Sequence, residues 1–574
     1  MVVFAEQKAR KGLGNSVIAA VLGLATATHL RAVAALVIIS LVAFLPGFLQ
    51  IPPVDQDEAR FAQATKQMIE TGDYVDIRFQ DEARYKKPVG TYWLQAAIVQ
   101  VAERLGVPRA RTRIGLYRIP SLLGAIGAVI VTYWAALAFV SRRAALLAGV
   151  MMATSILLGV EARLAKTDAL LLLTTVAALG AMARVYLAEQ GDRTVNAHPM
   201  AVVAIFWTAI AAGVLIKGPV ILVFVGFAAI ALIAIDRSAN WLWQLRPAIG
   251  VPWALILVLP WFLAILARTG GTFFADSLGE DMFAKVTRAQ ETHGMPPGFY
   301  LLAFWGTFFP GALLAGLATP AVWRARAEPG CKFLLAWVVP SWIAFELVPT
   351  KLPHYVLPLF PAIAILIAGV VNSHSLSQNR WLVRGTIWWF VIMALAAVFL
   401  IVLQIVVGQR LGLLTWVFGA AAVILSLFAW LLYRVDGAET SLMRAAAATI
   451  MLSVAAFGTT FPALRGLFPS ASLANSMRSA SCPDPVAVTV GFTEPSLIFL
   501  AGTNTSESTG SGAADFLLGG SCRVAFVDSR QERAFVQRAD TIGLRYAPGP
   551  RVEGFNIVRG QAVSIATFRS ERAP

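Results

Sequence analysis

The chain is poor in charge and in cysteine. Of its 574 residues, 14% are charged, 58% are hydrophobic and three are cysteine. A soluble protein with so few charged residues would lack the polar surface to cover itself, which excludes a soluble globular fold. Three cysteines cannot form a disulfide framework for the whole chain. No glycine-rich phosphate loop follows a strand, and no CxxC, HExxH or GxSxG pattern occurs. The chain therefore has no motif that indicates nucleotide-binding, zinc-peptidase or serine-hydrolase chemistry.

The sequence instead has many apolar runs long enough to cross a bilayer. A window of about 19 residues predicts a polytopic α-helical membrane protein with about thirteen transmembrane helices. Their expected centres are Ile39, Val129, Met152, Thr175, Ala209, Val225, Leu257, Leu313, Val339, Ile365, Ala397, Val423 and Met451.

The net charge of +15 comes mainly from basic residues in the short connections between apolar runs. That distribution follows the positive-inside rule and argues against nucleic-acid binding, which would cluster the basic residues in one soluble domain. We find no cleavable signal peptide, because the first long run, Ala32–Leu49, is followed by proline-rich sequence. An odd number of spans places the N-terminus in the cytoplasm and the C-terminus on the outer side of the membrane.

Two domains are predicted. Residues 1–468 form the transmembrane module, which includes a long outer loop, 52–118, and residues 469–574 form a small soluble α/β domain on the periplasmic side. Amphipathic helices lying in the membrane interface are expected at Asp57–Glu70, Val89–Leu105 and Phe273–Val286. In the C-terminal domain we expect strands at Val486–Val490, Val524–Val527 and Val563–Thr567, and helices at Pro495–Leu500 and Arg530–Arg538.

Cys482 and Cys522 each precede a predicted strand of the C-terminal domain. If the two strands are parallel neighbours, the sulfurs can meet, and an oxidising compartment permits a disulfide. The alternative is a pair of reduced, partly buried thiols.

Polar clusters that a membrane disfavours gather on the predicted outer side. Single members have ordinary explanations, since a lysine at a helix end extends to the headgroups and an aspartate before an apolar run caps a helix. Several on one face indicate a hydrated cavity instead. In such a cavity Arg60, Lys87, Lys217 and Lys351 would bind a phosphate leaving group, a carboxylate would deprotonate an acceptor hydroxyl, and tyrosine or tryptophan would contact a sugar or a prenyl chain.

These clusters resemble, in matching order over roughly residues 30 to 370, the ArnT-like glycosyltransferases of the C-type superfamily, which are related to protein O-mannosyltransferases. The matching segments are Asp57-Glu58-Ala59-Arg60-Phe61-Ala62, Gly72-Asp73-Tyr74, Lys87-Pro88-Val89-Gly90-Thr91-Tyr92-Trp93, Asp168, Lys217-Gly218-Pro219, His293 before Phe299-Tyr300, and Lys351-Leu352-Pro353-His354-Tyr355-Val356-Leu357-Pro358.

The resemblance implies a polyprenyl-phosphate sugar donor, inversion at the anomeric carbon and a cavity facing the periplasm. It also implies a multi-pass protein of a bacterial inner membrane, with the N-terminus cytoplasmic and the C-terminal domain periplasmic. The acceptor would be lipid A, a core saccharide or another envelope glycan. Asp57 and Asp168 resemble the essential carboxylates, with Asp57 expected to activate the acceptor. Lys87 would bind the donor phosphate, and the remaining substrate-binding residues would be Arg60, Tyr92, Lys217, Lys351 and Tyr355.

His293 resembles a histidine that can bind a metal. The sequence departs from the family here, because Lys86 stands where a glutamate usually precedes Lys-Pro, and a cation in place of a ligand makes a divalent ion doubtful. We therefore expect no required cofactor. Phe61 replaces a usual tyrosine, so the identity of the sugar is left open.

Two other functions are compatible with a charged membrane protein. A transporter or flippase for a lipid-linked or anionic substrate would place its charges near the bilayer midplane, often with repeat symmetry, whereas these charges cluster at one face and no repeat is found. A membrane scaffold would leave the charged outer loops without a role. Glycosyl transfer is the prediction that explains the clusters.

Overall fold

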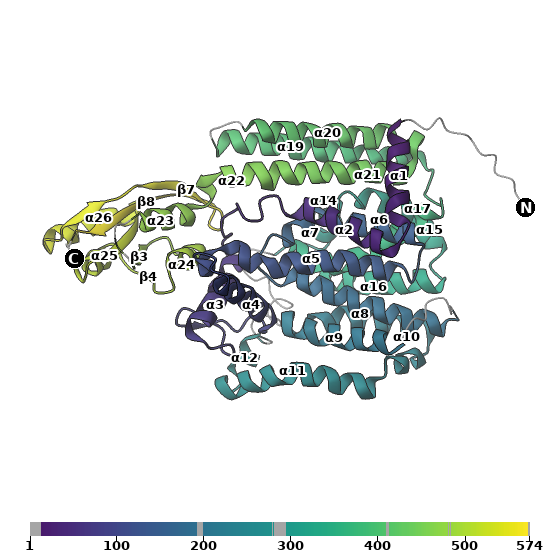
Figure 1. The fold of residues 1–574 in the computed structure, drawn as a ribbon, viewed down its shortest axis with the longest axis horizontal. Coiled ribbons are helices and arrows are strands. Elements are labelled where there is room, and N and C mark those ends of the chain that lie inside the picture. Colours follow the sequence, from purple (N-terminus) through teal and green to yellow (C-terminus); the bar gives the residue numbers. More distant parts are fainter. Residues whose placement is uncertain are drawn as a thin grey trace, which may run out of the picture.

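The structure is a computed structural model that describes residues 13–191, 199–277, 279, 294–408, 412–479, 482 and 484–571. It consists of a large helical body and a smaller lobe with strands, formed by the C-terminal part of the chain, that extends from one end of the body (Figure 1). The outer-loop helices α3 (Asp57–Thr71) and α4 (Gly90–Arg104) lie at that same end.

The helical body is built from the apolar runs. Its first half contains α1 (Leu13–Thr26), α2 (His29–Phe44), α5 (Ile114–Ala136), α6 (Arg142–Ala153), α7 (Ile156–Glu161), α8 (Asp168–Glu189), α9 (Pro199–Lys217), α10 (Val220–Asp236) and α11 (Pro247–Thr269). Its second half contains α14 (Phe299–Thr307), α15 (Ala312–Arg324), α16 (Pro329–Leu347), η5 (Pro353–Leu359), α17 (Phe360–Asn372), α18 (Arg380–Arg384), η6 (Gly385–Ile387), α19 (Trp388–Val406), α20 (Leu413–Leu431), α21 (Tyr433–Ser453), η7 (Val454–Thr460) and α22 (Phe461–Ala463).

The described residues contain nine helices long and apolar enough to cross a membrane, or ten if the bent pair α14 and α15 is one span. Ten of the thirteen predicted centres fall on these helices. Three expected centres, Ile39, Met152 and Val225, fall on helices α2, α6 and α10, which have only 16, 12 and 17 residues. A hydropathy window averages across helix ends, so it misses breaks such as the one at Thr154 between α6 and α7.

Helices α5 and α8 form the centre of the body. In α8, 83% of the most apolar window is buried inside the protein. Small residues let the two helices approach closely: a Cβ added to Gly180 would lie 2.8 Å from the Trp134 ring and 2.9 Å from Cβ of Ala135. This packing fixes the first residue of α8, Asp168, relative to the outer loop.

The outer loop contains the first two of the predicted amphipathic helices, α3 and α4, joined by the short hairpin of β1 (Arg78–Phe79) and β2 (Glu82–Ala83). The two helices pack together, and the Thr65 hydroxyl donates a hydrogen bond of 2.7 Å to Oε1 of Gln95. A 3-10 turn, η1 (Ala110–Thr112), leads into α5. Of the third predicted helix, the structure describes α12 (Thr272–Phe274), and most of the range lies outside the described residues.

The C-terminal lobe is a mixed sheet with helices, as predicted. Its elements are α23 (Pro469–Arg478), β3 (Val486–Val490), α24 (Pro495–Ala501), β4 (Ser506–Glu507), α25 (Gly510–Leu518), β5 (Arg523–Asp528), α26 (Ser529–Thr541), β6 (Tyr546–Pro548), β7 (Val552–Asn556) and β8 (Gln561–Ser570). The strand order is β4-β3-β5-β8-β6, with β7 also on β8; β3 is parallel to β4 and β5, and the pairs with β8 are antiparallel.

The parallel pairing of β3 and β5 brings Cys482 and Cys522 together. Val486 pairs with Arg523, the Cα atoms of the two cysteines are 5.7 Å apart, and the cysteines form a disulfide. Of the two alternatives left by the sequence, the disulfide is the one present, whereas Cys331 is a free thiol in the helical body.

The C-terminal lobe is attached to the outer loop through α24. Nζ of Lys66 in α3 donates to the Phe499 carbonyl oxygen at 3.1 Å, and Nε2 of Gln63 donates to the Thr503 hydroxyl at 2.9 Å. The lobe therefore braces α3, the helix that begins with Asp57.

Candidate active site

A polar cavity of about 320 Å³ opens where the outer loop meets the ends of the membrane helices. It is lined by the residues around the start of α3, the segment after β2, the loop before α8, the last residue of α9 and the segment leading into η5. Elements far apart in the sequence thus converge on one chamber, as the one-sided polar clusters predict.

The lining contains six basic and four acidic side chains. They are Arg60, Arg84, Lys86, Lys87, Lys166 and Lys217, and Asp55, Asp57, Glu58 and Asp168. Because the cations outnumber the carboxylates, the lining has an excess of positive charge suited to a phosphate group.

Glu58 fixes the segment that carries Asp57. Its carboxylate accepts two hydrogen bonds of 2.8 Å from Arg118, and others from the backbone N–H groups of Val54 at 2.8 Å and Ala165 at 2.9 Å. The side chains of Glu58 and Arg118 are each 1% exposed. Arg118 also donates to the Phe48 carbonyl oxygen, so this buried pair ties the end of the first membrane helix region to α3.

Asp57 itself is the first residue of α3 and is exposed to the cavity. Among the described residues, no hydrogen bond or ion pair engages its carboxylate. The preceding residue, Gln56, has φ of 69°, a conformation that costs a non-glycine residue energy and persists only where the surroundings enforce it. The carboxylate of Asp57 is therefore held in place by its backbone and is accessible to a substrate hydroxyl.

Asp168 begins α8 and lies in a buried cluster of charged groups. Nζ of Lys217 is 2.5 Å from Oδ1 of Asp168, and Nζ of Lys166 is 3.5 Å from Oδ2. Glu161 lies 3.0 Å from Lys166, and the His354 ring nitrogens lie 3.6 Å from both carboxylates. The lysine of α9 also lies over the ring of Tyr355, 5.7 Å from its centroid.

Glu161 and Lys166 belong to this cluster and lie outside the membrane spans. Burial and neighbouring charges shift the pKa of each group in opposite directions. Burial raises the pKa of Glu161, which the neighbouring Lys166 ammonium only partly opposes. Burial alone would lower the pKa of Lys166, but the carboxylates of Glu161, Asp168 and Asp57 raise it. Lys166 is thus a permanent cation that also attracts the carboxylate of Asp57.

The structure brings most of the predicted site residues together. Asp57, Asp168, Arg60, Lys87, Lys217 and Tyr355 all line the chamber. Two others lie next to it: Tyr92 is buried and its ring stacks on Phe61 at 5.0 Å, while Lys351 is buried and donates to the Val348 carbonyl oxygen. His293 lies outside the described residues.

Sequence patterns alone assign no role to the buried pair Glu58–Arg118, to Arg84, or to the charged neighbours of Asp168. Arg84 lines the chamber and lies over the Phe61 ring, 5.2 Å from its centroid. Each of these residues belongs to a polar segment or helix start that the sequence does display. Their roles depend on which partner they meet across the fold, and no spacing rule supplies that.

The cluster of Glu161, Asp168 and His354 has donor atoms within 4.8 Å of one another, a set whose chemistry suits a divalent cation. The fit fails on charge. The ammonium groups of Lys166 and Lys217 already lie 2.5 to 3.5 Å from the same carboxylates and would repel a second cation. The other position where the family resemblance predicts a metal ligand, directly before Lys87-Pro88, is occupied by Lys86. Its side chain is exposed and cationic. No step of the chemistry is therefore assigned to a metal.

Asp55 connects the chamber to the C-terminal lobe. The backbone N–H of Ser496, at the start of α24, donates to its Oδ1 at 3.0 Å. Burial raises the pKa of Asp55 to about 6, opposed by the Ser496 hydrogen bonds and by the Arg60 charge. The lobe thus contributes directly to the wall of the chamber.

Comparison with known proteins agrees with this arrangement. Residues 54–271 match the family model described as dolichyl-phosphate-mannose-protein mannosyltransferase. The chain is 26% identical over 341 residues to the undecaprenyl phosphate-alpha-4-amino-4-deoxy-L-arabinose arabinosyl transferase of Yersinia pestis (strain Pestoides F). The match spans 58% of this chain and 58% of that relative.

The fold is also similar to solved structures. ArnT from Cupriavidus metallidurans in the apo state superposes with a TM-score of 0.71 at 19% identity, covering 93% of this chain and 97% of that one. The same protein bound to undecaprenyl phosphate gives a TM-score of 0.70, covering 94% and 97%. The resemblance deduced from the ordered motifs is confirmed.

Proposed function

We propose that this chain, which resembles the ArnT-like glycosyltransferases in its sequence motifs and shares their fold, is an inverting glycosyltransferase. It moves a pentose or hexose from a polyprenyl-phosphate carrier to lipid A, a core saccharide or another envelope glycan. The observation that carries the proposal is the convergence of Asp57, Lys87, Asp168 and Lys217 on one polar chamber at the end of the membrane helices.

The basic side chains bind the donor. Lys87, Arg60 and Arg84 come from the outer loop and line one chamber, so they can surround a phosphate group with charge-assisted hydrogen bonds. Such contacts hold the donor in register and stabilise the negative charge that grows on the phosphate as the glycosidic bond breaks.

Asp57 is the general base. Its accessible carboxylate takes the proton of the acceptor hydroxyl, and the hydroxyl oxygen forms a bond to the anomeric carbon. The bond between that carbon and the phosphate oxygen breaks, and the polyprenyl phosphate leaves with the electron pair. Attack from the face opposite the leaving group inverts the anomeric configuration.

Asp168 has a different role, because Lys217 engages its carboxylate at 2.5 Å. A carboxylate paired with a cation is a weak base, so it is poorly suited to take a proton from the acceptor. The same pairing holds the lysine in a defined position. We assign to Asp168 the orientation of Lys217 toward the substrate, with Tyr355 packed against that lysine. Lys166, held by Glu161, supplies a further fixed cation.

The membrane arrangement is part of the proposal. The chamber faces the periplasm of a bacterial cell, the N-terminus is cytoplasmic, and the C-terminal domain, 469–574, is periplasmic. The positive-inside rule supports this orientation, since α5 begins next to the outer loop and spans to Ala136, and Arg142 and Arg143 follow at its far end. A disulfide between Cys482 and Cys522 is suited to an oxidising compartment.

The test is reconstitution. Purified protein is mixed with a polyprenyl-phosphate sugar and an acceptor glycolipid, and the acceptor is analysed by mass spectrometry. A mass increase of one sugar residue supports transfer. A protein that moves the lipid-linked sugar across vesicles without forming any product would be a transporter, and the proposal would be wrong.

A further inference from the structure

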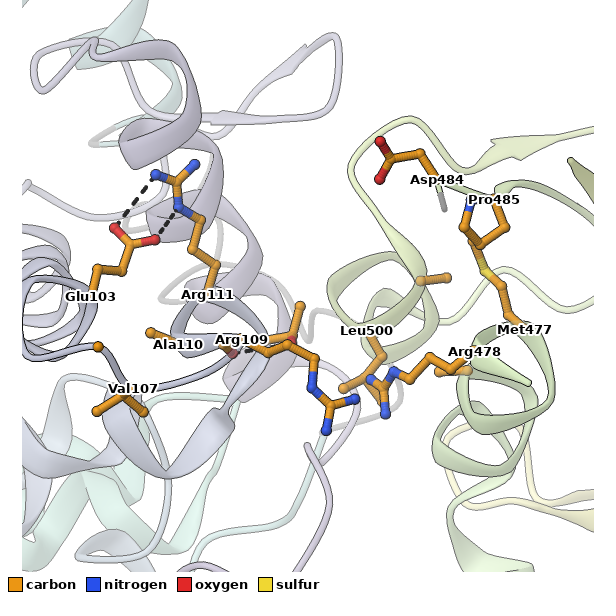
Figure 2. Close-up of a pocket in the computed structure, with 14 residues that line it drawn as sticks. Glu103, Val107, Arg109, Ala110, Arg111, Met477, Arg478, Asp484, Pro485 and Leu500 are labelled. Carbon is orange, nitrogen blue, oxygen red and sulfur yellow. Dashed lines mark hydrogen bonds and ion pairs between the residues drawn. The ribbon is translucent and has the colours of Figure 1, made fainter. Parts of the chain in front are cut away.

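A second cavity, of about 590 Å³, lies on the seam between the outer loop and the C-terminal lobe (Figure 2). One wall is formed by the end of α4 and by η1, and the other by α23, the end of α24 and the segment before β3. It shares no lining residue with the polar cavity lined by Asp57, Lys87 and Asp168, which we call the donor chamber.

Two arginines from opposite walls of this cavity lie close together. Figure 2 shows the guanidinium groups of Arg109 and Arg478 directed toward the same region, while the Asp484 carboxylate lies at the other end. Among the described residues, no hydrogen bond or ion pair engages the guanidinium of Arg109. The guanidinium of Arg478 donates to the neutral side chain of Asn475 at 2.9 Å, and no carboxylate within the described part of the chain pairs with it.

The other basic residue of the cavity is already neutralised. Nε of Arg111 is 2.5 Å from Oε1 of Glu103, and this pair lies apart from the two arginine heads in Figure 2. Desolvation and the nearby Arg109 charge lower the pKa of Arg478, as expected where like charges are held together. An anion between Arg109 and Arg478 would relieve that repulsion.

An adjoining cavity of about 380 Å³ shares Arg478, Thr112 and Leu500 with the first. It adds a fourth arginine, Arg113, and apolar side chains including Leu49 and Leu116. The two cavities therefore combine a basic region with an apolar one, which suits a ligand with an anionic head and an apolar chain.

The position along the chain sets the depth of these cavities in a membrane. Arg109 and Arg113 directly precede α5, a membrane-spanning helix that begins at Ile114. Basic residues at the start of a membrane span lie at the level of the lipid headgroups. Leu49 and Leu105, at 73% and 77% exposed, present apolar surface nearby.

We infer that this seam is a binding site for the phosphate group of a membrane lipid, held between Arg109 and Arg478 with Arg113 beside it and with an acyl chain along Leu49 and Leu116. The site is separate from the donor chamber. It is nevertheless near it, because Ser496 contacts Asp55 of the chamber while Leu500 lines the seam, and four residues of helix rise by about 6 Å. A lipid bound here is therefore placed with its headgroup beside the reaction chamber.

Lipid binding to the full-length protein in detergent tests this inference by native mass spectrometry. The probes are dioleoyl phosphatidylglycerol, lipid A with both phosphates, and inorganic phosphate as a competitor. The test variant is Arg109→Gln with Arg478→Gln. The charge-matched control is Arg104→Gln with Arg545→Gln, which also removes one exposed arginine from each side without touching either cavity.

The test variant should bind the lipid about tenfold to a hundredfold more weakly than the control, since hydrogen bonds to charged groups are lost. Restoring charge with Arg109→Lys and Arg478→Lys should recover part of the binding, which distinguishes a binding defect from misfolding. Selective loss of lipid A binding identifies a phosphorylated glycolipid as the ligand, and equal loss of both lipids identifies a general phospholipid. The inference is overturned if the test and control variants bind lipid equally, or if the protein binds inorganic phosphate but neither lipid. The measurement involves no donor or turnover, so its result is independent of the proposed function.

Discussion

Lys217, the last residue of α9, lies with its Nζ 2.5 Å from Oδ1 of Asp168, the first residue of α8. The side chains are only 10% and 6% exposed, so each charge depends on the other. The contact joins the ends of two membrane helices at the floor of the donor chamber.

This relationship predicts non-additive effects. Lys217→Met and Asp168→Asn should each reduce transfer strongly and lower thermal stability, because each leaves a buried charge without its partner. The double variant should be less damaged than the sum, with a coupling energy of about 1–3 kcal/mol. Thermal unfolding in detergent measures this coupling, and strictly additive losses would show that the pair is not a unit.

Asp57→Asn should reduce turnover on the order of 10²-fold or more, since it removes the general base, while binding of the polyprenyl-phosphate donor stays nearly unchanged. Initial rates and donor binding are measured on the same preparation. Asp81→Asn is the control, because Asp81 is an exposed carboxylate of the same loop that does not line the chamber. An active Asp57→Asn enzyme would remove Asp57 from this role.

Lys87→Ala should weaken donor binding about tenfold to a hundredfold, as expected for the loss of a charged contact to phosphate. Binding of polyprenyl phosphate, measured by native mass spectrometry or by isothermal titration calorimetry, reports this directly. Arg104→Ala serves as the control, because Arg104 ends α4 and lies outside the chamber. Unaltered affinity in Lys87→Ala would assign the phosphate to other side chains.

Glu58→Gln should destabilise the protein by about 3–5 kcal/mol, because Arg118 would keep its buried charge without a counter-ion. Loosening of the segment before α3 should also lower the rate of transfer, although Glu58 does not contact the reacting atoms in our proposal. Limited proteolysis of the outer loop and thermal unfolding measure the effect. Glu82→Gln, at an exposed position of β2, should leave both properties unchanged.

Asp55 predicts a dependence of stability on pH. Its pKa is raised from 3.8 to about 6 in the folded state, chiefly by burial, so the native state holds a proton that the unfolded state releases. The free energy of unfolding therefore falls by about 1–3 kcal/mol as the pH rises from 3.8 to about 6. Above that range the titration of Asp55 has no further effect on stability.

Asp55→Asn keeps an acceptor for the Ser496 N–H but carries no charge. The variant should be more stable than the natural protein above about pH 6 and similar to it below about pH 4. Thermal unfolding across this pH range in detergent checks the prediction. An unchanged pH dependence in the variant would show that Asp55 does not titrate as inferred.

Much of the fold is readable from the sequence because it depends on local patterns. The periodicity of Asp57–Glu70 identifies α3, and the β-branched run Val486–Val490 identifies β3. The number of membrane spans is less accessible. A helix such as α6 ends where Thr154 interrupts it, and hydropathy averages do not register that break.

The candidate site is predictable only in part. Charges at helix ends must meet in water, so Asp57 and Asp168 could be placed in one chamber before the fold was known. Which side chains pair is a property of the packing. The sequence gives no means to know that Lys351 would turn to the Val348 carbonyl, or that His354 would lie between Glu161 and Asp168.

The contacts of α24 with the outer loop have a consequence for the evolution and engineering of this protein. Because Phe499 and Thr503 contact α3 from the C-terminal lobe, the segment that begins with Asp57 is held between the helical body and that lobe. A shortened protein that stops at residue 468 would lack both of these contacts with α3. Substitutions in the C-terminal lobe can therefore shift α3, and with it Asp57, without any change among the membrane helices.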